Sequence, residues 1–158
     1  MSDLLNQVAQ YYDDKLRTHG QTAKGVDWNG EDSQNLRFAQ LCRVLPDAGP
    51  ISVNDLGCGY GAFYEYLKTQ RTDAVTYNGY DVSAEMVAAA KQRLGNSNNL
   101  HLACTAEPDR IADFTIASGI FNVRMDRSDA EWLPYIEGVL DVMDRASTHG
   151  FAFNCLTS

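Results

Sequence analysis

Two acidic residues and three glycines form the part of this sequence best suited to chemistry. Asp55 ends a short β-type run, and Gly57, Gly59 and Gly61 follow it at alternate positions. Glycine adopts positive φ without steric cost and lets the backbone come close to a ligand. Asp81 ends a second such run about twenty residues later, the spacing at which an acid binds ribose hydroxyls. This pattern predicts a site for a ligand that contains a ribose.

The same glycines fit more than one class of ligand. Gly57, Gly59 and Ala62 match the dinucleotide pattern G-x-G-x-x-G/A, which is weak when it stands alone. A carboxylate at Asp55 would repel a pyrophosphate, whereas it would attract an ammonium group. A positively charged nucleoside is therefore favoured over the cofactor of an NAD-dependent oxidoreductase. A glycine turn that binds no ligand is the third alternative.

The two acids require strands to hold them side by side. We expect strands at 51–55, 75–81, 100–104, 114–118 and 150–155. We expect helices at 4–19, from 31 to Pro46, at 62–70, at 83–94 and onward from a capping box at Ser128. This alternation predicts an α/β fold, a three-layer, doubly wound, mainly parallel sheet preceded by two helices. Ligands bind at the carboxyl ends of such strands, where Asp55 and Asp81 lie.

Three segments resemble the class I (Rossmann-like) S-adenosylmethionine-dependent methyltransferases. Residues 55–61 resemble their first motif, 80–83 their second, and 112–119 their fourth strand. S-adenosylmethionine has no phosphate and carries an ammonium and a sulfonium, which agrees with the carboxylate of Asp55. The resemblance implies the strand order 3-2-1-4-5. It also implies in-line methyl transfer, in which the protein mainly aligns the two reactants.

The resemblance implies a role for each residue of the cofactor site. Asp55 would bind the ammonium, directly or through water, and Asp81 would accept hydrogen bonds from both ribose hydroxyls. The remaining cofactor contacts that we expect are Gly57, Gly59, Gly61, Val82, Met86 and Ser118. Asp81 has the alternative of capping the helix that follows Ser83. Val82 and Met86 have the alternative of belonging to the core.

The sequence does not identify a catalytic residue as it does the cofactor site, because a general base is needed only if the nucleophile arrives protonated. His19 is a candidate base since its pKa lies near neutrality, and Asn122 follows the fourth strand near the expected reaction centre. Each residue also has an alternative without a catalytic role: His19 would be an ordinary exposed histidine, and Asn122 would cap a turn. Other segments expected near the site are Thr105, Ala106 and Glu107 after the third strand, Gly119 after the fourth, and Tyr11, Tyr12 and Trp28 near the N-terminus.

Composition limits the partners. The chain has 158 residues, 44% hydrophobic and 22% charged, with a formal net charge of −8. The proportions are those of a globular domain, and the negative charge disfavours nucleic acid and anionic membranes as partners. We see no signal peptide, no membrane span and no C-x-x-C pair among the four cysteines. We expect a cytoplasmic protein with buried free thiols, no metal and a small-molecule acceptor.

One domain is expected over 1–158. Residues 1–49 would supply the N-terminal helices and a lid-like loop, and 50–158 the Rossmann-like core. The resemblance implies two further strands, a hairpin beside strand five, for which this sequence has no segment. We therefore expect a truncated product, or self-association through strand five, because an uncovered edge strand promotes pairing with another chain. A non-catalytic cofactor-binding scaffold remains an alternative function.

Overall fold

The computed structural model describes residues 2–26 and 30–155 of the chain. Trp28, which we expected near the site, lies outside the described residues. The elements are α1 (Asp3–His19), η1 (Ala23–Val26), α2 (Glu31–Leu41), η2 (Cys42–Val44), β1 (Ile51–Leu56), α3 (Ala62–Gln70), β2 (Val75–Asp81), α4 (Ala84–Leu94), β3 (Leu100–Cys104), β4 (Ala112–Ala117), α5 (Asp129–Arg145) and β5 (Ser147–Phe153).

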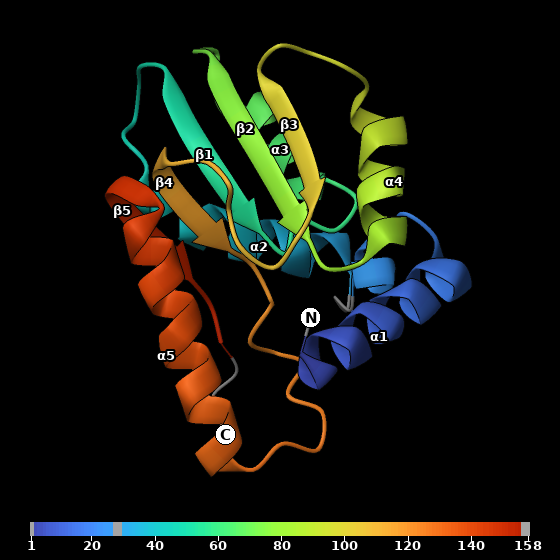
Figure 1. Ribbon diagram of the computed structural model, residues 1–158. Helices are drawn as coiled ribbons and strands as arrows, with labels where there is room; N and C mark the ends of the chain where they lie inside the picture. Colours follow the sequence, from blue (N-terminus) through green and yellow to red (C-terminus); the bar gives the residue numbers. More distant parts are fainter. Residues whose placement is uncertain (1, 27–29, 156–158) are drawn as a thin grey trace.

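The sheet has five parallel strands in the order β3-β2-β1-β4-β5, as the sequence predicts. The helices cover both faces: α2 and α3 lie behind the sheet in Figure 1, and α5 lies in front of it. Helix α1 lies below the carboxyl ends of the strands in the same view. Asp55 pairs in register with Gly79 on the neighbouring strand, so the ends of β1 and β2 meet at one edge.

Local sequence explains where the helices begin. Ser83 precedes α4, and its hydroxyl accepts from the Met86 N–H, so it is an N-cap. Ser128 and Glu131 form a capping box before α5, as expected. Gly61, with φ of 93°, precedes α3 in the left-handed region. A Cβ at this glycine would lie 2.5 Å from Leu94 Cδ1, so Gly61 also lets α3 pack against α4.

The two faces of the sheet carry different cores. Behind the sheet, aromatic and aliphatic side chains of α2 and α3 pack on the strands in a large apolar cluster; its members include Phe38, Leu41, Phe63, Leu67, Val53, Tyr77 and Ile116. In front, Met143 of α5 packs on a smaller cluster with Leu56 and Tyr80. This burial is the main source of stability for the fold.

The end of the chain departs from the expectations in detail. Strand β5 begins at Ser147, three residues before the predicted position, and ends at Phe153 rather than at residue 155. Its side chains are half-buried or exposed, and Phe153 is 37% exposed. Strand β5 lies at the sheet edge and pairs with β4. Within the described part of the chain, its outer side has no neighbouring strand.

The cysteines partly correct the sequence prediction. All four are free, but Cys104 and Cys155 are exposed rather than buried, because they lie at or beyond the ends of edge strands. Among the described residues, no group of three or more His, Cys, Asp or Glu side chains is placed to hold a metal ion. No helix in the described ranges is both long and apolar enough to cross a bilayer.

Candidate functional site

A cavity of about 480 Å³ lies at the carboxyl ends of β1, β2 and β4. Its walls come from the strand ends, the glycine loop, the loops after β3 and β4, α1 and α5. The structure brings together seven of the eight predicted cofactor residues in this lining: Asp55, Gly57, Gly59, Asp81, Val82, Met86 and Ser118. The eighth, Gly61, is not among the lining residues.

Asp81 is held by backbone N–H groups of two segments, the glycine loop and the start of α4. Its Oδ2 accepts from the Gly59 N–H and its Oδ1 from the Ser83 N–H, each at 2.9 Å. The side chain is 8% exposed, and burial raises its pKa to about 6, although these N–H donors oppose the rise. Each carboxylate oxygen has a second lone pair. Asp81 thus fixes the glycine loop and still has acceptor capacity toward the cavity.

Asp55 is held by a side chain. The Tyr77 hydroxyl donates to its Oδ2 at 2.5 Å, and the carboxyl is 2% exposed. Burial raises the pKa of Asp55 to about 7; the bond from Tyr77 opposes the rise, and the charge of Asp81 adds to it. A cation in the cavity would favour the ionised form. Tyr77 gives no signal of this role in the sequence beyond its place in a strand.

Gly57 shows why the loop requires glycine. Its φ is 75°, and a Cβ at this position would lie 2.2 Å from Ile120 Cγ2 in the loop after β4. A side chain here would therefore strain the backbone and push the two loops apart. Gly57 and Ile120 both line the cavity. The loop after β1 and the loop after β4 are thus close enough to contact one ligand together.

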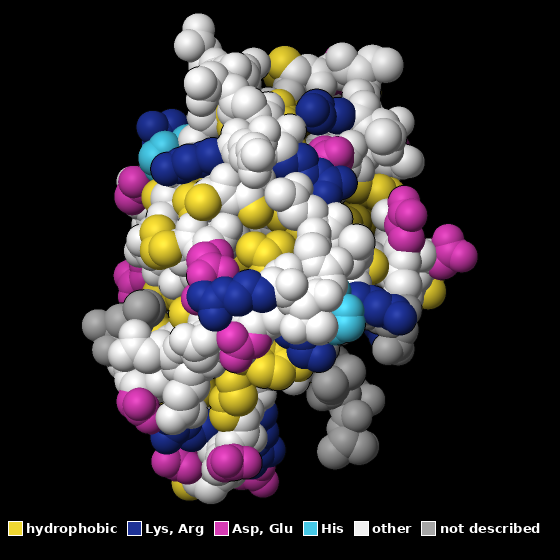
Figure 2. Space-filling model, turned by 90° about the vertical axis from the view of Figure 1, so that its right-hand side faces the viewer, with side chains coloured by type: hydrophobic (Ala, Val, Ile, Leu, Met, Phe, Trp, Pro, Cys, Tyr) yellow, Lys and Arg dark blue, Asp and Glu magenta, His cyan; other side chains and the backbone are white. Residues whose placement is uncertain are grey.

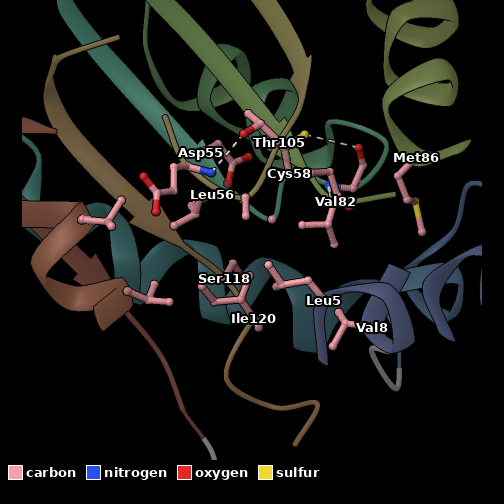
Figure 3. A pocket seen from close by; sticks show the side chains of 18 of the residues that line it. Leu5, Val8, Asp55, Leu56, Cys58, Val82, Met86, Thr105, Ser118 and Ile120 are labelled. Carbon is pink, nitrogen blue, oxygen red and sulfur yellow. Dashed lines mark hydrogen bonds between the residues drawn. The ribbon is translucent and has the colours of Figure 1, made fainter. Parts of the chain in front are cut away.

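The remaining predicted contacts surround these acids. Met86 is 1% exposed and Val82 half-buried, and both lie on one side of the cavity in Figure 3. Ser118 Oγ is buried and has no hydrogen-bond partner in the described part of the chain. An unpaired buried hydroxyl at a cavity wall is suited to a polar ligand group. Thr105, Ala106, Glu107 and Gly119 also line the cavity.

Helix α1 supplies one wall of the cavity. Leu5, Val8 and Tyr12 line the cavity, and Leu5 and Val8 lie across from Val82 and Met86 in Figure 3. Tyr12, which we expected near the site, belongs to this lining. None of the residues of α1 is fully buried, because the helix lies over the cavity mouth. The apolar stripe of this helix was visible in the sequence, but its target was not.

The structure does not bring the two candidate catalytic residues to the cavity. His19 is exposed at the end of α1 and is not among the lining residues. The Asn122 N–H donates to the Gly119 carbonyl at 3.1 Å, which closes a turn, and Asn122 is also absent from the lining. Tyr11 is outside the lining too, and its ring lies edge-on to Tyr12.

The charge of the lining is unequal. Among the described lining residues the acids are Asp55, Asp81, Glu107 and Asp141, and the one base is Arg145. Figure 2, which views the molecule from another side, shows acidic and basic side chains interspersed over that face. The cavity lining thus carries more acids than bases, as the whole chain does with its net charge of −8. It suits a cationic ligand better than a phosphate.

Comparison with known proteins identifies the family. Residues 54–150 match the family described as "Methyltransferase domain", and the chain belongs to this family. Over 118 residues it is 51% identical to "Putative methyltransferase Rv1506c" of Mycobacterium tuberculosis (strain ATCC 25618 / H37Rv). That match covers 73% of this chain and 69% of the relative. The family assignment replaces the interpretation as an NAD-dependent oxidoreductase.

Solved structures share the fold at low identity. Mycolic acid cyclopropane synthase CmaA1, complexed with SAH and CTAB, is 16% identical, with a TM-score of 0.60; the match covers 77% of this chain and 42% of that one. DhpI, in a SAM-HEP complex, is 18% identical with a TM-score of 0.65. That match covers 100% of this chain and 69% of the DhpI chain. N-methyltransferase NodS of Bradyrhizobium japonicum WM9, in complex with S-adenosyl-l-homocysteine, is 17% identical with a TM-score of 0.60. That match covers 85% of this chain and 67% of the NodS chain. The chain spans 35% to 51% of the length of several such structures.

Proposed function

We propose that the chain binds S-adenosylmethionine in the cavity and transfers its methyl group to a small-molecule acceptor. The observation that carries this proposal is the pair of buried carboxylates, Asp55 and Asp81, beside the glycine loop in one cavity. The family assignment supports it, and three of the structural relatives described above were solved with SAM or SAH.

The residues fit this cofactor. Asp55 would accept from the ammonium of the methionine part and Asp81 from the ribose hydroxyls. Gly57 and Gly59 would allow close approach, Val82 and Met86 would contact adenine, and Ser118 would face the methyl donor. The unpaired Ser118 Oγ and the acidic lining support a polar, cationic ligand.

The acceptor would bind against the apolar wall. Leu5 and Val8 of α1, Ile120, and Pro134 and Tyr135 of α5 line this part of the cavity. Such a wall suits an acceptor with an apolar or aromatic body rather than a polyanion. Transfer would proceed as an in-line displacement: the acceptor nucleophile forms a bond to the methyl carbon, the bond from sulfur breaks, and the electron pair neutralises the sulfonium. We assign neither His19 nor Asn122 a role in this step.

Calorimetry would test the proposal directly. S-adenosylhomocysteine should bind with one-to-one stoichiometry, whereas NAD should give no heat of binding. The variant Asp47→Ala, which changes an exposed acid outside the cavity, should bind as the wild type does. Binding of NAD without a response to S-adenosylhomocysteine would overturn the proposal. Cofactor binding without turnover on a panel of phenols, amines and carboxylic acids would favour the scaffold alternative.

We further propose self-association through β5 and a cytoplasmic location. Among the residues that the structure describes, no strand pairs with the outer edge of β5, and the end of β5 carries the exposed Phe153. Both features promote pairing with a second copy. Sedimentation should reveal a concentration-dependent dimer, and a non-associating monomer would contradict it. The free thiols support a reducing compartment, which localisation of a tagged chain would check.

A further inference from the structure

Tyr77 lies between the apolar core and the cavity. Its side chain is 0% exposed, and its ring packs against Tyr64 with the centroids 4.8 Å apart. The hydroxyl nevertheless finds a partner, because it donates to Asp55 Oδ2 at 2.5 Å. Tyr77 does not itself line the cavity, whereas Asp55 does. The Tyr77 hydroxyl thus contacts a cavity-lining residue from the side of the apolar core.

Gly79 makes this contact sterically feasible. Tyr77 and Gly79 are two positions apart on β2, so both face the same side of the sheet. Gly79 also pairs in register with Asp55 on β1. A Cβ on Gly79 would lie 2.9 Å from Tyr77 Cε1 and 3.1 Å from Cys58 Sγ. The missing side chain therefore leaves the space in which the Tyr77 ring extends along the strand toward Asp55.

We propose that Tyr77 is a positioning residue for the cofactor: it holds one oxygen of Asp55 so that the other is presented to the ammonium of the methionine part. This inference rests on the proposed function. Burial and the neighbouring Asp55 raise the pKa of Tyr77 well above its ordinary value, so the hydroxyl remains protonated and donates. Asp81 differs, since two backbone N–H groups hold both of its oxygens. Asp55 depends on a side chain that a substitution can remove.

The affinities for two ligands distinguish a positioning role of Tyr77 from a merely structural one. S-adenosylhomocysteine carries the amino acid part, and 5′-methylthioadenosine lacks it while sharing the adenosine. Tyr77→Phe keeps the ring and removes the hydroxyl. It should weaken S-adenosylhomocysteine binding roughly tenfold, in the range for hydrogen bonds to charged groups. Its affinity for 5′-methylthioadenosine should equal that of the wild type. Tyr64→Phe, which changes the neighbouring ring of the same cluster, should alter neither affinity.

The pH profile gives a second readout. The titratable groups that face Asp55 are Tyr77 and Asp81 of β2 and Cys58 of the glycine loop. Without the hydroxyl donor, ionised Asp55 is less favoured, so the midpoint for S-adenosylhomocysteine binding should move to higher pH in Tyr77→Phe. Asp55→Asn is the companion variant, because its amide oxygen still accepts from Tyr77 but carries no charge. It should lose affinity for S-adenosylhomocysteine alone; an equal loss for 5′-methylthioadenosine would mean that Asp55 does not bind the ammonium, and the role of Tyr77 would be overturned with it.

The outcomes are distinguishable. Equal losses for both ligands, or no loss for either, would overturn the positioning role and leave the proposed function standing. Selective loss for S-adenosylhomocysteine, with the shifted pH midpoint, would support the role. Wild-type protein that binds neither ligand would overturn the proposed function itself, and the role of Tyr77 with it.

Discussion

The two walls of the cavity are built in different ways. On the sheet side, Asp55 and Asp81 are 2% and 8% exposed, and hydrogen bonds fix them to β2 and to the loops. On the opposite side, α1 has no fully buried residue. Three polar contacts attach it to the rest: Asp13 with the buried Ser83, and, at the surface, Arg17 with Glu85 and Asp3 with Arg127. The sheet wall is therefore preorganised for a ligand, and the helical wall is the less stable element.

The largest expected effect comes from breaking the sheet wall at Asp81. Asp81→Ala should weaken S-adenosylhomocysteine binding by roughly 1.5–3 kcal/mol, the range for hydrogen bonds to a charged group. It should also lower the free energy of unfolding, because the N–H groups of Gly59 and Ser83 lose their acceptor. Calorimetry and urea unfolding measure the two effects. Unchanged affinity in a folded variant would reduce Asp81 to a helix cap.

The pH dependence sharpens the same comparison. Because the pKa of Asp55 is raised to about 7, the folded protein binds this proton more tightly than the unfolded chain. The associated stability is complete below pH ~4 and is lost as the pH rises through about 7. An ammonium favours the carboxylate, so the affinity for S-adenosylhomocysteine should instead rise roughly tenfold from pH 6 to pH 8.

Asp55→Asn isolates this titration from that of Asp81, whose pKa of about 6 lies nearby. The variant should show weaker binding with a flatter pH profile, and its free energy of unfolding should fall less between pH 4 and pH 8 than that of the wild type. A profile as steep as that of the wild type would assign the titration to another group.

The sheet wall was largely predictable from sequence, and the helical wall was not. Asp55, Gly57, Gly59 and Asp81 lie in short segments whose backbone geometry follows from a strand that ends in a glycine turn. The contact of Tyr77 with Asp55 depends on strand register and on the space above Gly79, neither of which a local pattern contains. The apolar stripe of α1 predicts a helix, but periodicity does not say which surface it faces.

A smaller effect is expected from the helical wall itself. Val8→Ser removes apolar surface where α1 faces the cavity, and Val8 is half-buried rather than fully enclosed. Its effect on S-adenosylhomocysteine affinity should stay below about fivefold, since the two methyl groups that are lost are only partly buried. Val44→Ser, at a half-buried valine outside the cavity, is the matched control. A loss as large as that of Asp81→Ala would show that the two walls matter equally.

The smallest effect on affinity is expected from Asp13, although this residue bears most directly on how α1 is attached. The Ser83 hydroxyl donates to Asp13 Oδ1, and the same oxygen of Ser83 accepts from the Met86 N–H at the start of α4. Asp13 also adds to the raised pKa of Asp81. Asp13→Ala therefore loosens α1 and at the same time favours ionised Asp81. These consequences oppose one another in ligand binding, so the affinity should change by less than about twofold.

Hydrogen exchange separates these consequences, because it reports on each element by itself. Amides of α1 should exchange faster in Asp13→Ala, while those of β1 and β2 keep their protection, since the sheet does not depend on this contact. Asp13→Asn retains an acceptor for Ser83 and should exchange like the wild type. Faster exchange in β1 and β2 would mean that the sheet wall is supported by α1, and the two walls would then form one cooperative unit.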